Sequence, residues 1–65
     1  MVNARYIAYV LRTLNRIGMI PAHEDARAAL QYARDNGLVA DANGNAVVTR
    51  KGLDFIQDFI DEDRD

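Results

Sequence analysis

The sequence predicts an α+β fold that is mostly helical, with three helices and a short β-hairpin between the second and the third. Three stretches repeat apolar residues at the spacing of a helix that buries one face. The dipeptide Asn43-Gly44, with apolar residues on both sides, is a strong signal for a tight hairpin turn. With 65 residues, the chain is expected to form a single domain over residues 1–65, with its last few residues frayed.

The first predicted helix runs from Asn3 to Ile17. Asn3 suits the N-cap position, where its side chain accepts a hydrogen bond from the first turn. Gly18 tolerates the left-handed conformation that commonly ends a helix. The apolar residues predicted to form one buried stripe are Ile7, Val10, Leu11, Leu14 and Ile17.

The second predicted helix begins at Pro21 or Ala22 and ends near Asn36. Proline suits the first turn, because the amide hydrogen that it lacks has no helical partner there. Gly37 is then expected to end the helix, with Leu38 packing back on it. The inner face consists mainly of small side chains, which allow a neighbouring element to approach closely: Ala22, Ala26, Ala29, Leu30 and Ala33.

Two short β-strands are predicted at residues 38–40 and 46–48, with residues 41–45 forming the turn. Thr49 is the expected N-cap of a third helix, from Arg50 to about Glu62. Its predicted apolar face consists of Leu53, Ile56 and Ile60, widened by Phe55 and Phe59.

The order of these motifs has a parallel in a known family. Asp35-Asn36-Gly37-Leu38-Val39 ends a helix, the hairpin follows, and Thr49-Arg50-Lys51-Gly52 opens the last helix. Residues 28–60 thereby resemble the second half of a winged-helix domain. This chain resembles a truncated winged-helix domain, because only residues 19–21 stand where that family has a further helix. The resemblance implies a transcriptional regulator that reads duplex DNA with its second helix and its hairpin wing.

The resemblance also implies where DNA would bind. In the family, contacts come from the exposed face of the recognition helix and from the wing. Arginine can bond guanine bidentately and glutamine can bond adenine, so the outward side chains suit readout of the major groove. The alternative is an ordinary solvated face, with Arg27 paired to Glu24 or His23. The candidate DNA-binding residues are Arg27, Gln31, Arg34, Asn43, Asn45, Arg50 and Lys51.

The net charge of −2 conceals a strong segregation of charge along the chain. The first twenty residues contain arginines and no acid, whereas residues 52–65 are strongly acidic. A second basic stripe shares one face of the first helix: Arg5, Tyr9, Arg12 and Arg16. An acidic stripe has the same spacing on the third: Asp54, Asp58, Asp61 and Asp65.

The two stripes leave several functions open. The basic stripe suits phosphate contact and base stacking, and it suits an acidic protein surface equally well. The acidic stripe could imitate a row of phosphates. The stripes could meet across a subunit interface, or they could be unrelated solvated faces. The alternative function is therefore a protein-interaction module, such as a small inhibitor or adaptor.

Catalysis and metal binding are not expected. The chain has no cysteine and no serine, so thiolate metal sites, disulfides and the common nucleophile dyads are excluded. The single histidine, His23, is expected at the surface or as a helix cap. Asp41-x-Asn43-x-Asn45 resembles the start of a calcium loop, but Ala46 and Gly52 stand where that loop needs glycine and glutamate. No enzyme activity and no cofactor are predicted.

A homodimer is expected, because a chain this short without disulfides has a marginal core. Aromatic residues extend the apolar stripes of the first and third helices: Tyr6, Tyr9, Phe55 and Phe59. A twofold pairing that buries part of either helix would remove them from water. No apolar run is long enough for a membrane span and no secretory pattern opens the chain, so a cytoplasmic location is expected.

Overall fold

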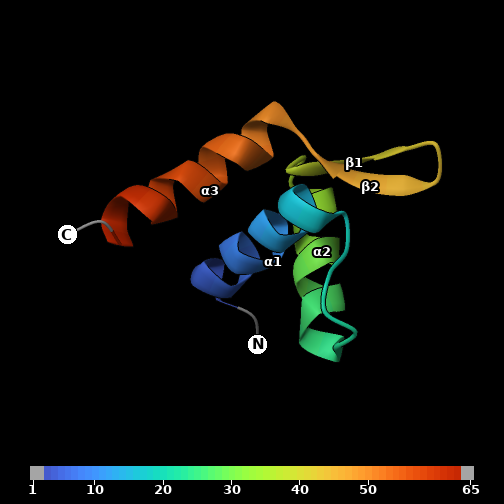
Figure 1. The fold of residues 1–65 in the computed structure, drawn as a ribbon, viewed down its shortest axis with the longest axis horizontal. Helices are drawn as coiled ribbons and strands as arrows, with labels where there is room; N and C mark the ends of the chain where they lie inside the picture. The colour runs from blue at the N-terminus through green and yellow to red at the C-terminus, as the bar shows by residue number, and fades with distance from the viewer. Residues whose placement is uncertain (1–2, 64–65) are drawn as a thin grey trace.

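The computed structural model describes residues 3–63, with side chains described through residue 59. The elements follow the order α1 (Ala4–Ile17), α2 (Glu24–Asp35), β1 (Val39–Ala42), β2 (Asn45–Val48) and α3 (Arg50–Asp63). Helix α1 packs against both other helices, and the hairpin projects away from α3 (Figure 1). The predicted mostly helical α+β fold is confirmed. No helix in the described range combines the length and apolar character needed to cross a bilayer.

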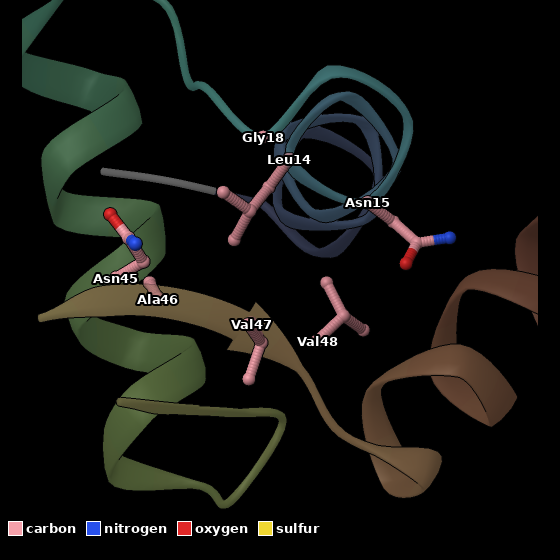
Figure 2. A pocket seen from close by; sticks show the side chains of 7 residues that line it. All are labelled: Leu14, Asn15, Gly18, Asn45, Ala46, Val47 and Val48. Atoms are coloured by element: carbon pink, nitrogen blue, oxygen red, sulfur yellow. The ribbon is translucent and has the colours of Figure 1, made fainter. Parts of the chain in front are cut away.

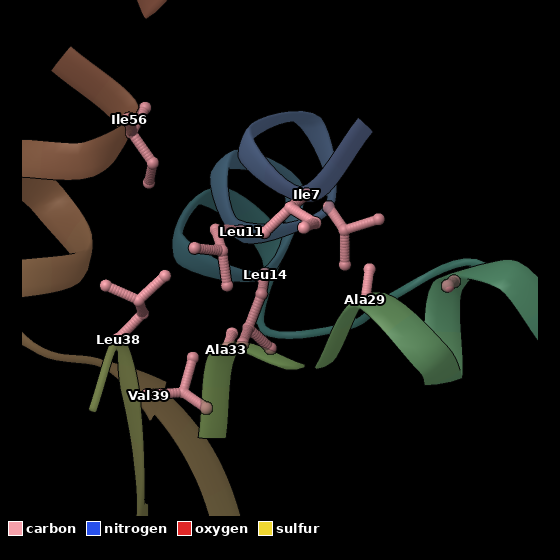
Figure 3. Close-up of a cluster of buried hydrophobic side chains, with 10 residues drawn as sticks. Ile7, Leu11, Leu14, Ala29, Ala33, Leu38, Val39 and Ile56 are labelled. Carbon is pink, nitrogen blue, oxygen red and sulfur yellow. The ribbon is translucent and has the colours of Figure 1, made fainter. Parts of the chain in front are cut away.

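The core forms where the apolar stripe of α1 meets the small inner face of α2. Val10 and Leu11 are completely buried, and so are the three alanines that α2 contributes. Because an alanine methyl group is small, the two helices can approach closely. Figure 3 shows how side chains from the hairpin and α3 complete this core, which comprises Ile7, Val10, Leu11, Leu14, Ala26, Ala29, Ala33, Leu38, Val39 and Ile56.

Helix α2 begins later than the sequence predicted. Its first residue is Glu24, and His23 is the N-cap, whose Nδ1 accepts a hydrogen bond from the Asp25 amide at 3.1 Å. The predicted start at Pro21 or Ala22 is therefore wrong, and Ala22 is exposed in the connection instead of lining the inner face. The predicted capping role of His23 is confirmed.

Two residues predicted in the buried stripes are exposed. Ile17 is the last residue of α1 and is 65% exposed. Leu53 is 42% exposed, because Gly52 and Ile56 occupy the core-facing positions of α3. Phe55 is half-buried, as is Phe59; the predicted burial of Ile60 falls outside the described side chains.

The hairpin is longer and its turn tighter than predicted. Each strand has four residues, and Val39 pairs with Val48 at the open end while Ala42 pairs with Asn45 at the turn. Only Asn43 and Gly44 form the turn, with φ of 53° and 81°. Two successive positive φ angles are typical of a type I′ turn, which matches the twist of the strands and favours Asn-Gly.

The connection from α2 to β1 is a Schellman motif. The Leu38 amide donates to the Ala33 carbonyl at 2.8 Å, and the Gly37 amide donates to the Arg34 carbonyl at 3.2 Å. Gly37 adopts a φ of 74°, which a residue with a Cβ reaches only with strain. Leu38 turns back into the core and is 4% exposed, as the sequence predicted.

Thr49 joins the end of α2 to the start of α3. Its amide donates to the Leu38 carbonyl at 2.9 Å, and its hydroxyl donates to the Gly37 carbonyl at 2.7 Å. The same hydroxyl oxygen accepts from the Gly52 amide at 3.1 Å, which confirms its role as a helix cap. One side chain therefore satisfies backbone groups of two helix termini that are distant in sequence.

Gly52 allows α3 to approach the α2–β1 connection closely. A Cβ at this position would overlap the Leu38 carbonyl oxygen and would lie 2.7 Å from Cγ1 of Val48. Gly52 itself is buried. Any larger residue would force apart the two strand ends that join the helices, and the Thr49 hydrogen bonds would be lost with them.

We expect Thr49→Val to lower the free energy of unfolding by about 1–3 kcal/mol, because the variant keeps the shape but loses both hydroxyl hydrogen bonds. Thr49→Ser keeps the hydroxyl and is the matched control, expected to stay within about 0.5–1 kcal/mol of the parent. Urea denaturation followed by circular dichroism measures both. An equal decrease in the free energy of unfolding in the two variants would contradict the proposed role of the Thr49 hydroxyl in stabilising the junction.

Candidate nucleic-acid interface

Three of the seven candidate DNA-binding residues lie along one flank of α2. Arg27, Gln31 and Arg34 are exposed, while the alanine face of the helix is turned into the core. At 1.5 Å of rise per residue, they extend about 10 Å along the helix. The sequence prediction that they share a solvent-facing stripe is consistent with their exposure.

Two of these three side chains contact carboxylates of the protein itself. Nη2 of Arg34 lies 3.0 Å from Oδ1 of Asp41 on strand β1. Nε2 of Gln31 donates to Oδ1 of Asp35 at 2.9 Å, one turn further along α2. Arg27 forms no ion pair with any residue in the described part of the chain, so the pairing with Glu24 or His23 that the alternative of a solvated face included is not found.

The Arg34–Asp41 pair connects α2 to the hairpin. Strand alternation puts Asp41 on the same face of the hairpin as Val39, which is buried against the helices. Arg34 therefore reaches this face from the last turn of α2. The pair is partly open to water, with the side chains 40% and 63% exposed.

The candidate residues of the hairpin and α3 lie at opposite ends of the strands. Asn43 and Asn45 are exposed at the tip, where they present amide groups to solvent. Arg50 and Lys51 are exposed at the start of α3, after the open end of the hairpin. A four-residue strand spans about 13 Å, so the two pairs do not form one cluster. Arg50 Nε lies 4.0 Å from Oδ1 of Asp54.

The second basic stripe occupies the outer face of α1. All four of its residues are exposed, on the side opposite the core: Arg5, Tyr9, Arg12 and Arg16. Tyr9 is 55% exposed as a residue, and the centroid of its ring lies 6.0 Å from that of Tyr6. Helix α1 contains no acidic residue, so this face is basic along its length.

The acidic stripe is described only in its first half. Asp54 and Asp58 are exposed on α3, on the face away from Gly52 and Ile56. The side chain of Asp61 and the whole of Asp65 lie outside the described residues. Within the described range, no group of three or more histidine and acidic side chains is placed to hold a metal ion.

A hollow beside the hairpin had no signal in the sequence. It has a volume of about 460 Å³ and lies between the end of α1 and strand β2, where Val48 points toward α1 and Val47 points to the opposite side (Figure 2). Its lining residues come from segments about 30 positions apart, so only the fold brings them together: Leu14, Asn15, Gly18, Asn45, Ala46, Val47 and Val48.

Comparison of the chain with protein-family models, with curated proteins and with solved structures found no significant match. The arrangement of three helices with an antiparallel hairpin between the second and third is compatible with a winged-helix-like fold.

We expect Asp41→Asn to change the free energy of unfolding by less than about 1 kcal/mol, because exposed ion pairs contribute little to stability. Urea denaturation of this variant and of Asp35→Asn, which removes the neighbouring carboxylate without touching the hairpin, provides the comparison. If the free energy of unfolding fell by more than about 2 kcal/mol in Asp41→Asn but not in Asp35→Asn, the ion pair between Arg34 and Asp41 would be what holds the hairpin on α2.

Proposed function

We propose that this protein binds duplex DNA through the exposed flank of α2 together with the adjacent hairpin. The observation that carries the proposal is the row formed by Arg27, Gln31 and Arg34. An α-helix fits the major groove, and these side-chain types match the hydrogen-bonding edges of guanine and adenine. The winged-helix-like order of elements supports the same use of α2 and the hairpin.

The carboxylates beside this row do not prevent such binding. The Arg34–Asp41 pair is solvent-exposed, and exposed pairs are worth about 0–1 kcal/mol. A bidentate contact to a base is worth about 1–3 kcal/mol, so DNA can compete for the guanidinium group. The nearby acids would lower non-specific affinity for phosphate, which leaves base contacts a larger share of the binding energy.

The second candidate function is a protein-interaction module. It is favoured by the outer face of α1, where Arg12 and Arg16 are exposed beside Tyr9 with no acid on the same helix. Arginine and tyrosine are enriched at protein interfaces, where they supply hydrogen bonds and apolar area. An acidic protein surface would complement this face.

Two double variants, each of which removes two positive charges, distinguish DNA binding through α2 from protein binding through α1. We expect Arg27→Ala/Arg34→Ala to weaken binding to duplex DNA by about 10- to 100-fold, because contacts to bases are lost. Arg12→Ala/Arg16→Ala, with the same change in charge, is expected to weaken binding by less than about threefold. Fluorescence anisotropy with labelled duplexes at several salt concentrations measures both affinity and its salt dependence.

Two results would contradict the proposal. One is the absence of DNA binding by the parent protein at about 50 mM salt, where phosphate contacts are strong. The other is a larger loss in Arg12→Ala/Arg16→Ala than in Arg27→Ala/Arg34→Ala. Recovery of one acidic protein from lysate despite nuclease treatment, with recovery lost in Arg12→Ala/Arg16→Ala, would favour the second candidate.

A further inference from the structure

Strand β2 has one edge without a partner strand in the described part of the chain. The two residues next to the turn, Ala42 and Asn45, form the closing pair of a two-residue hairpin, and hydrogen-bonded pairs then alternate along the strands. The Thr49 amide bond to the Leu38 carbonyl follows this alternation. The N–H and C=O groups of Ala46 and Val48 therefore point away from β1.

This edge lacks the features that usually prevent edge-to-edge pairing. Native edge strands are commonly protected by charged residues, by proline or by a bulge. The segment Asn45–Val48 contains no charge and no proline, and its register with β1 is continuous. The other edge of the hairpin is different, because β1 carries Asp41, whose carboxylate is 63% exposed.

The space beside the edge is open. The hollow of about 460 Å³ follows all four residues of β2 and is bounded on its other side by the end of α1 (Figure 2). Val47, on the face of the strand away from α1, is 44% exposed. Both the backbone groups of the edge and an apolar side chain beside them are thus accessible.

We propose that β2 of a second copy of this chain pairs with this edge in an antiparallel manner, around a twofold axis at Val47. In this register Ala46 of one copy is hydrogen-bonded to Val48 of the other, and the reverse contact follows by symmetry. Val47 then faces Val47 of the second copy in a non-hydrogen-bonded pair, with Cβ atoms about 4.5–5.5 Å apart. The two hairpins become one four-stranded sheet.

The distribution of charge along the strand suits a second copy as the occupant. Antiparallel pairing brings the start of α3 of one copy toward the hairpin tip of the other. The start of α3 carries Arg50 and Lys51, both exposed, whereas the only charged residue between positions 36 and 49 is Asp41. Asp41 lies on β1 and is paired with Arg34 at 3.0 Å. The basic start of α3 in each copy therefore meets the uncharged turn of the other, like charges do not face each other, and no charge is carried into the centre of the paired strands.

The absence of native cysteine allows a direct test of the register. In the proposed dimer of Val47→Cys, the two thiols would lie on facing residues whose Cα atoms are about 4.5 Å apart, which is within the range for a disulfide. Under mild oxidation we expect covalent dimers to form at least about tenfold faster than for Leu53→Cys. Leu53 is a matched control, because it is 42% exposed and lies on α3. Equal rates for the two variants would overturn the proposed pairing.

A second pair of variants tests the interface without oxidation. Val47→Lys would put two like charges opposite each other, while Leu53→Lys adds the same charge elsewhere. Sedimentation equilibrium from about 10 µM to about 1 mM covers the range of a small interface. We expect dimers for the parent and Leu53→Lys, and single chains for Val47→Lys with unchanged helical circular dichroism. A single-chain mass for the parent throughout, or dimers of Val47→Lys, would overturn the proposal.

Discussion

The close contact between Gly52 and the Leu38 carbonyl is the constraint on which the arrangement of hairpin and helices depends. It brings the first turn of α3 against the end of α2, although 14 positions separate these two residues. Thr49 can bond the Gly37 carbonyl and the Gly52 amide only at this short separation. The hairpin between the two helices is held at its open end by the same contacts, because Leu38 and Thr49 flank its strands.

The positions of the two proposed binding surfaces follow from this junction. It fixes where β1 leaves α2, and Asp41 consequently comes within 3.0 Å of Arg34. It also fixes the direction of β2 along the end of α1, which leaves one strand edge and a hollow open beside it. The hairpin adjoins the proposed DNA-binding flank of α2 and also carries the proposed dimer edge on β2, so a dimer would hold two copies of the α2 flank in a defined relative orientation.

Local patterns in the sequence were enough to predict the order and type of the elements, though not the start of α2 or the full length of the strands, because caps and turns act through neighbouring residues. Asn3, Gly37, Thr49 and the Asn43-Gly44 turn all behave as their local chemistry predicted. Burial depends on long-range contacts, and there the periodicity failed: Leu53 fits the apolar stripe of α3, but the glycine contact turns Gly52 inward and leaves Leu53 at the surface. The contacts of Gln31 and Arg34 show the same contrast between local and long-range interactions. Asp35 is a local i+4 neighbour, whereas Asp41 approaches only when the chain folds.

The most direct test of the central contact is the sign of the stability change in Gly52→Ala, measured by urea denaturation. Alanine in place of glycine inside a helix ordinarily stabilises a protein by about 0.5–1 kcal/mol. At this position the added methyl group would meet the Leu38 carbonyl and the Val48 side chain, so we expect a loss of at least about 2 kcal/mol. An unchanged or increased stability would mean that α3 does not depend on this close approach.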